Sequence, residues 1–171
     1  MTAAGVQPIA RATGPYYAIG MGTPIADNPT SGRIVDGEHR YACRVFFEDT
    51  DLTGAVYHAN YLRFMERART EMLRAVGIDQ RPAFEAGEGS YAVTDLRIRY
   101  VQPAKLDDLL IIHSKIAKLG PARTVIHQRV MLNDAVVAEA EVTVAFLNRA
   151  GRPRRQPADW VEKFRSIAGA D

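Results

Sequence analysis

The pattern of apolar and polar positions changes its period along this chain. Residues 38–48 alternate with a period of two, which predicts a β-strand. From residue 60 to about residue 76 the apolar positions recur every three to four residues, as on one face of an amphipathic helix, with Arg69 as the polar exception on that face. Gly77 follows directly, at the position where such a helix commonly ends.

The remainder of the patterned region reads as strands, and no second helix is expected there. Four segments have the alternation and composition of strands, namely 91–101, 109–119, 123–132 and 135–147. Pro103, Gly120-Pro121 and Asn133-Asp134 lie between them and predict turns. The predicted order is therefore β-α-β-β-β-β, an α+β fold with a five-stranded, mostly antiparallel sheet beside one long helix.

Residues 1–32 differ from the rest because they show no sustained period and are rich in Pro, Gly, Ala and Thr. We expect a loosely ordered N-terminal extension there, followed by one domain over residues 33–171. No apolar run approaches the roughly 18–20 residues that a membrane span needs. The first residues also lack the pattern of a secretory or transit peptide, so neither a membrane span nor a targeting signal is expected.

Composition narrows the possible functions. Hydrophobic residues make up 47% of the 171 residues, which suffices for a packed core, and the net charge of +2 does not indicate a nucleic-acid partner. The single cysteine, Cys43, excludes an internal disulfide and favours a reducing compartment, so we expect a cytoplasmic protein. No metal site is expected, because neither HxH nor HExxH spacing occurs among His39, His58, His113 and His127.

The segment that carries most chemistry runs from residue 47 to residue 62. Asp49 and Asp51 precede a glycine turn at Gly54, and His58 lies just before the predicted helix. This layout brings a carboxylate, an imidazole and the positive end of a helix dipole into one small volume, which suits hydrolysis of an activated acyl compound. The residues alone favour turn and helix-capping chemistry for Asp and His at such positions, and they leave a catalytic role open as the second explanation.

An extended set of residues in this region resembles the hotdog-fold acyl-CoA thioesterases, specifically the 4-hydroxybenzoyl-CoA thioesterase family in its Tol–Pal-associated branch. The resemblance covers roughly residues 40–148 and rests on Phe46-Phe47-Glu48-Asp49-Thr50-Asp51, Gly54, Val56-Tyr57-His58, Asn60-Tyr61 and Phe64-Met65-Glu66-Arg67-Ala68-Arg69. It implies a hotdog fold, in which the sheet wraps around the helix. It also implies hydrolysis of an acyl-CoA thioester to free acid and coenzyme A, with no cofactor besides the coenzyme A of the substrate.

The resemblance assigns roles to individual residues. Asp51 is implied as the essential carboxylate, acting as nucleophile or as general base, and His58 as a group that assists proton transfer or orients the thioester. Gly54, Val56 and Tyr57 are implied as substrate-binding residues, in a turn whose backbone N–H groups would polarise the thioester carbonyl.

Coenzyme A requires a phosphate-binding surface, and relatives grip the nucleotide where Lys118 and Arg123 fall here. The resemblance thus implies these two residues as substrate-binding. A second group of basic candidates is Arg149, Arg152, Arg154 and Arg155. For each basic candidate taken singly, a solvated loop charge is the simpler explanation. Tyr91 and Val93, from the strand expected near the helix, are candidate lining residues of an acyl pocket.

Two other functional classes stay open, because hotdog domains serve several functions. One is a hydratase or dehydratase acting on an acyl thioester, and the other is a non-catalytic acyl-thioester or protein-binding module. One helix can cover only one face of the sheet, so we expect partner subunits to cover exposed edges and faces, in a homodimer or homotetramer. The identity of the acyl group does not follow from the sequence.

Overall fold

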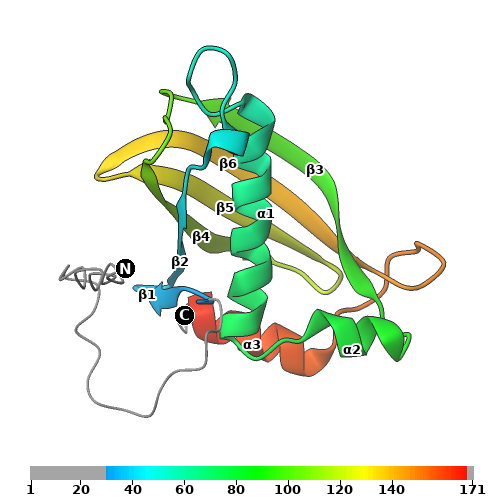
Figure 1. The fold of residues 1–171 in the computed structure, drawn as a ribbon. Coiled ribbons are helices and arrows are strands. Elements are labelled where there is room, and N and C mark those ends of the chain that lie inside the picture. Colours follow the sequence, from blue (N-terminus) through cyan, green and yellow to red (C-terminus); the bar gives the residue numbers. More distant parts are fainter. Residues whose placement is uncertain (1–29, 169–171) are drawn as a thin grey trace, which may run out of the picture. The chain divides into compact units, whose positions relative to one another are not determined.

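The computed structural model describes residues 30–168. Six strands form one sheet in the order β1-β2-β4-β5-β6-β3, and every neighbouring pair is antiparallel (Figure 1). The strands are β1 Arg33–Val35, β2 Glu38–Arg44, β3 Ser90–Tyr100, β4 Leu109–Leu119, β5 Arg123–Leu132 and β6 Ala135–Leu147. Nearly all of the predicted N-terminal extension, residues 1–29, lies outside the described residues.

The prediction of five strands was wrong by one, because β1 was missed. This strand joins β2 through a two-residue turn at Asp36 and Gly37, which have φ of 51° and 74°. An Asp-Gly pair with positive φ at both residues is typical of the turns that match the twist of a β-hairpin. The missed strand is only three residues long, too short to show an alternation of its own.

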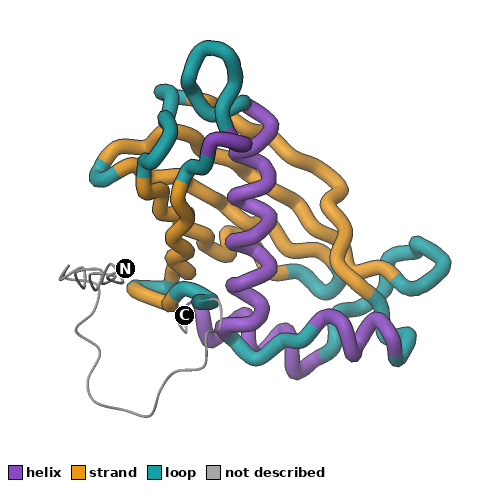
Figure 2. Tube along the Cα trace, viewed as in Figure 1, coloured by secondary structure: helices purple, strands orange, loops and turns teal. Residues whose placement is uncertain are grey.

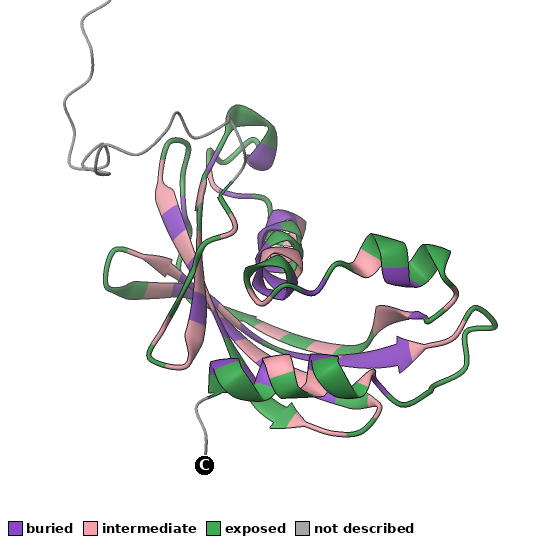
Figure 3. Ribbon diagram, turned by 90° about the horizontal axis from the view of Figure 1, so that it is seen from below, coloured by how far each residue is buried: buried purple, intermediate pink, exposed green. Residues whose placement is uncertain are grey.

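The long helix is confirmed and begins two residues before its predicted start. α1 (His58–Ala75) lies on the concave side of the curved sheet (Figures 1 and 3). The residues that it buries against the sheet recur every three or four positions: Tyr61, Phe64, Met65, Ala68, Arg69, Met72 and Leu73. These side chains and the inner residues of the sheet form the hydrophobic core.

The helix ends where the sequence predicts, through a defined backbone motif. Gly77 has φ of 70°, and its N–H donates to the carbonyl of Arg74 over 2.9 Å. The N–H of Ile78 donates to the carbonyl of Leu73 over 2.9 Å, and the Ile78 side chain is buried. These two bonds are the pair that closes a Schellman motif, which requires a left-handed residue at the glycine position.

The first predicted strand is shorter than expected. β2 ends at Arg44 rather than continuing to residue 48, and a single 3-10 turn, η2 (Phe47–Asp49), follows. The carboxylate of Asp49 accepts a hydrogen bond from the N–H of Phe46 over 2.9 Å, which folds the chain back. The alternation of apolar and polar residues thus continues in the sequence beyond the end of β2, which is why the predicted strand was too long.

The expectation that no helix follows α1 was also wrong. Helices α2 (Gln80–Glu85) and α3 (Ala158–Ala168) follow α1 in the chain, and helical segments are coloured purple in Figure 2. The Asp79 side chain caps α2 by accepting from the N–H of Arg81. α3 lies below the end of α1 in Figure 1 and buries one face. None of the helices within residues 30–168 is long and apolar enough to cross a membrane.

Candidate active site

Asp51 lies in a tight turn between η2 and α1. Its N–H donates to the carbonyl of Ala55 over 2.9 Å, and its carbonyl accepts from the N–H of Gly54 over 2.9 Å. Gly54 has φ of 76°, and a Cβ there would meet nothing within 4 Å. The glycine is thus required by backbone conformation rather than by space.

The Asp51 carboxylate faces solvent and accepts two hydrogen bonds from one residue. The Thr53 hydroxyl donates to Oδ1 over 2.6 Å, and the Thr53 N–H donates to the same oxygen over 2.8 Å. These two bonds, with a smaller contribution from the nearby His58, hold the pKa of Asp51 below its ordinary value. The group is therefore an anion at neutral pH, as a nucleophile or general base must be.

The turn is tied to the start of α1 through the backbone of Asp49. The carbonyl of Asp49 accepts from the N–H of Tyr57 over 2.9 Å and from Nδ2 of the buried Asn60 over 3.0 Å. The Asp49 carboxylate is itself buried and bonded to the N–H of Phe46. Asp49 thus has a buried turn-capping role, whereas the Asp51 carboxylate bonds to Thr53 within its own turn and stays exposed to solvent.

His58 is the first residue of α1 and its side chain is exposed. Its carbonyl accepts from the Tyr100 hydroxyl over 3.0 Å, which links the helix start to the end of β3. The His58 ring lies with buried Val56, Tyr61, Tyr100 and residues 101–103 around a shallow groove. Two of the predicted site residues, Val56 and His58, therefore line one groove, and the backbone of Asp51 is bonded to Ala55 beside it in the chain.

The first turn of α1 leaves backbone donors without an intrahelical partner. The first amides of a helix have no intrahelical carbonyl to bond, and they carry the positive end of its dipole. The Tyr57 N–H is already engaged by the Asp49 carbonyl, so the amides of His58 and Ala59 are those that remain at this end. An oxyanion placed beside the groove could be stabilised by these donors.

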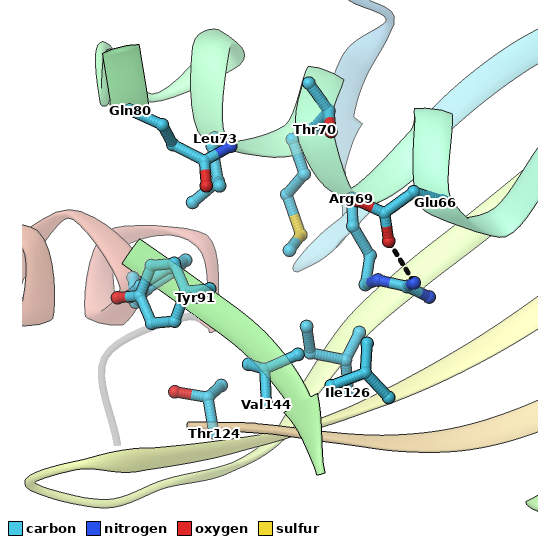
Figure 4. A pocket seen from close by; sticks show the side chains of 12 residues that line it. Glu66, Arg69, Thr70, Leu73, Gln80, Tyr91, Thr124, Ile126 and Val144 are labelled. Carbon is cyan, nitrogen blue, oxygen red and sulfur yellow. Dashed lines mark hydrogen bonds and ion pairs between the residues drawn. The ribbon is translucent and has the colours of Figure 1, made fainter. Parts of the chain in front are cut away.

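A separate cavity of about 170 Å³ lies between α1 and β3 (Figure 4). Tyr91 and Val93, the two candidates from β3, both line this cavity. Its wall also includes Arg69, which is buried and bonds to Gln128 Oε1 over 2.6 Å and to Glu66. Sequence analysis identified Arg69 only as an exception in an apolar helix face, and this exception was the available signal for a polar group in the core.

Lys118 and Arg123 are distant from Asp51 within one chain. Both lie at the β4–β5 hairpin, and Arg123 is level with Ala145 of β6, whereas Tyr100, which contacts His58, is level with Ala138. Seven residues of an extended strand span roughly 23 Å. The structure therefore does not bring the two basic residues to the carboxylate of the same subunit.

The second group of basic candidates serves partly to hold the fold. Arg149 donates to the carbonyl of Glu85 over 2.7 Å, and Arg154 donates to the carbonyl of Glu88 over 2.7 Å. These bonds fix the connection from α2 to β3. Two of the four arginines are thus explained by structure, while Arg155 lines an open groove with the 120–121 turn.

Other reactive side chains do not form a second centre in the described part of the chain. Burial raises the pKa of the Cys43 thiol to about 12, so it is a protonated packing residue at neutral pH. Between residues 30 and 168, no three His, Cys, Asp or Glu side chains are grouped as a metal site would require. The exposed apolar residues Phe46, Phe47 and Leu52 instead surround the Asp51 turn, with Leu52 fully exposed.

The chain is similar to known thioesterases in sequence and in structure. Residues 45–167 match the family model described as the thioesterase-like superfamily. The chain is 40% identical to the acyl-CoA thioesterase YbgC of Haemophilus influenzae over 112 residues, which cover 66% of this chain and 82% of that one. It is 38% identical to the acyl-CoA thioester hydrolase YbgC of Escherichia coli O6:H1 over 128 residues, which cover 74% and 95%.

A solved structure agrees with these relationships. The crystal structure of a probable thioesterase from Bartonella henselae matches with a TM-score of 0.68 and 36% identity, over 70% of this chain and 99% of that one. The chain therefore has the hotdog fold and belongs to the thioesterase-like superfamily.

Proposed function

We propose that this protein is an acyl-CoA thioesterase, which hydrolyses an acyl-CoA thioester to a free acid and coenzyme A. The observation that carries the proposal is the Asp51 carboxylate, which is exposed, ionised and next to His58 at the positive end of α1. Thioesterase relatives with up to 40% identity support the same reaction.

Two routes for hydrolysis suit this geometry. In one, the Asp51 carboxylate attacks the carbonyl carbon, the C–S bond breaks, and water then hydrolyses the mixed anhydride and restores the carboxylate. In the other, the carboxylate takes a proton from a water molecule that attacks directly. In both routes the first amides of α1 stabilise the negative oxygen, and His58 is placed to deliver a proton to the departing thiolate.

The site is completed by a second subunit in this proposal. β3 is an edge strand of 11 residues, and its outer edge pairs with no other strand among residues 30–168. An exposed edge of that length is a template for pairing with another chain. Antiparallel pairing of two β3 strands would place the Ser90 end of one subunit beside the Tyr100 end of the other.

This pairing would also account for the distant basic residues. Lys118 and Arg123 lie toward the Ser90 end of β3 and would approach the Asp51 turn of the other subunit. We therefore keep both as residues that bind the phosphates of coenzyme A, across the subunit boundary. A Ki for free coenzyme A that is unchanged in Arg123→Ala would remove Arg123 from this role.

A cytoplasmic location is part of the proposal. Acyl-CoA thioesters are intracellular metabolites, and the single cysteine can form no internal disulfide. Recovery of the protein in an extracytoplasmic fraction of its source cells would contradict this location.

The reaction class can be tested by thiol release from a panel of aliphatic and aromatic acyl-CoA esters, followed with a thiol-reactive dye. A thioesterase releases one thiol for each ester consumed. A hydratase would change the absorbance of an enoyl-CoA without releasing thiol, and a binding module would bind esters without turnover. Either of the last two results would replace the proposed function.

A further inference from the structure

We propose that Phe164 on α3 closes the far end of the cavity between α1 and β3, and that it sets the longest acyl chain the enzyme accepts. The inference rests on the proposed thioesterase function and extends it to acyl-chain selection. Helix α3 takes no part in the reaction steps of the proposed function.

The walls of the cavity come from several elements, and α3 contributes one residue. Arg69 and Leu73 line it from α1, Tyr91 from β3 and Phe164 from α3. Figure 4 shows Arg69 and Tyr91 on opposite sides of the space. The rings of Phe164 and Tyr91 meet nearly edge to face, with centroids 6.1 Å apart. In the dimer proposed above, the Asp51 turn of the other subunit lies beside the Ser90 end of β3. The acyl tail of an ester bound at that turn would enter this cavity and end against the aromatic pair.

The aromatic pair is held firmly on its outer side. The Tyr91 hydroxyl points away from the cavity and donates to Gln156 Oε1 over 2.5 Å (Figure 4). Gln156 Nε2 donates in turn to the carbonyl of Gly120 over 2.6 Å. The Trp160 ring packs behind Tyr91, with centroids 5.9 Å apart. This wall is held by hydrogen bonds and ring contacts, so moving it aside for a longer acyl chain would cost free energy.

The helix that carries Phe164 is anchored along its length. Trp160, Phe164 and Ile167 are all buried, at spacings of four and three residues, so one face of α3 packs into the core. Lys163 Nζ donates to the carbonyl of Gly77 over 2.8 Å, which joins α3 to the end of α1. Phe164 therefore behaves as a stop rather than as a mobile lid.

The size of the cavity indicates the class of acyl group. An engineered protein cavity of about 150 Å³ accepts benzene, so a space of about 170 Å³ holds an acyl tail with roughly the bulk of one six-membered ring. Shorter tails leave part of the space empty, and longer tails meet Phe164. Each methylene that is buried should raise kcat/KM about fourfold until the stop is reached.

The test is the dependence of kcat/KM on chain length for straight-chain acyl-CoA esters from butanoyl to tetradecanoyl. Three variants change the size of the stop: Phe164→Ala, Phe164→Leu and Phe164→Trp. The optimum should move to longer chains by about two to four carbons in Phe164→Ala, and less far in Phe164→Leu. It should move to shorter chains in Phe164→Trp, because a larger ring fills part of the cavity.

Ile167→Ala is the matched control, because Ile167 is buried on the same helix but does not line the cavity. It should lower stability and leave the optimum where it is in the wild type. If Phe164→Ala does not fold, the inference is tested by the chain-length optimum of kcat/KM in Phe164→Leu and Phe164→Trp. Active variants that all keep the wild-type optimum would overturn the inference and leave the thioesterase function standing. A wild-type protein that releases thiol from no ester would instead overturn the proposed function, and the inference with it.

Discussion

The protonation state of Asp51 depends on a single neighbouring threonine. The Thr53 hydroxyl donates to the carboxylate, and this bond is the main cause that lowers the pKa of Asp51. Thr53→Val removes the hydroxyl and should raise that pKa, so the acid limb of kcat/KM against pH should move to higher pH. Thr50→Val is the control, because the Thr50 hydroxyl donates to the carbonyl of Phe47 instead. An acid limb that stays in place in Thr53→Val would show that this carboxylate does not control the rate.

A buried histidine should make the fold sensitive to mild acid. His39 is fully buried, its Nε2 lies 2.6 Å from the carbonyl of Ser31, and burial lowers its pKa below the usual 6.5. The folded state thus binds a proton at His39 less tightly than the unfolded state does. Protonation of His39 therefore leaves the free energy of unfolding unchanged above pH 6.5 and lowers it as the pH falls below that value.

The measurement is the melting temperature between about pH 7.5 and about pH 5.5 for the wild type and His39→Gln. The wild type should lose more stability across this interval than the variant does. Glu38 should not contribute to the change in this interval, which lies above its usual pKa of 4.5. Burial alone would raise the pKa of Glu38, but its polar contacts lower that pKa overall. Glu38 bonds to His113 and Arg129, and its contribution is lost only in stronger acid. Equal slopes in the two proteins would contradict the assignment to His39.

At the level of single residues, the candidate reacting groups were easier to predict from the sequence than the lining of the cavity. Asp51, Gly54 and His58 lie within eight positions of one another, so a local pattern could bring them together. Phe164 reaches the cavity from a helix more than 90 residues beyond Leu73, and no local pattern relates two such residues. The position of Lys118 and Arg123 relative to Asp51 likewise depends on tertiary structure and on a second subunit.

Among the secondary-structure elements, α1 is joined to the sheet by a buried polar network. Arg69 donates to Gln128 Oε1, and Gln128 Nε2 donates to the Met65 carbonyl over 3.0 Å and to Ser114 Oγ over 2.9 Å. Arg69→Met would leave the Gln128 oxygen buried without its donor, which should lower the free energy of unfolding by about 1–3 kcal/mol.

Urea unfolding measures this effect, with Arg74→Met as the matched control. Arg74 is an exposed residue on the same helix that pairs with Glu71. A surface pair of this kind contributes about 0–1 kcal/mol, so the control should change stability little. Similar losses in both variants would mean that the network does not stabilise the attachment of the helix.

The order of the main elements was predictable because each element is long enough to show its own hydrophobic periodicity. α1 and the four later strands run for 10 residues or more, and the structure confirms them with small shifts of their ends. The missed elements are β1 and α2, which have 3 and 6 residues, and α3, which has 11. α3 carried a readable signal, because Pro157 precedes it and Trp160, Phe164 and Ile167 recur at helical spacing.

For the whole molecule, the open edge of β3 predicts a homodimer. Val93, Tyr100 and Val101 are between 43% and 49% exposed along and just beyond this strand, which leaves apolar surface beside the unpaired edge. Two copies of the 18.9 kDa chain give about 38 kDa, and light scattering after size-exclusion chromatography should report this mass or twice it. A stable particle with the mass of a single chain would contradict a site completed by a second subunit.

The most direct test of the account is the rate of acyl-CoA hydrolysis by Asp51→Asn beside Glu48→Gln. Glu48 is an exposed carboxylate three residues away in η2, so the control removes a nearby negative charge without touching the proposed reacting group. We expect kcat/KM to fall at least about a hundredfold in Asp51→Asn and to stay close to wild type in Glu48→Gln. A folded Asp51→Asn protein that hydrolyses the best ester at the wild-type rate would contradict the central claim.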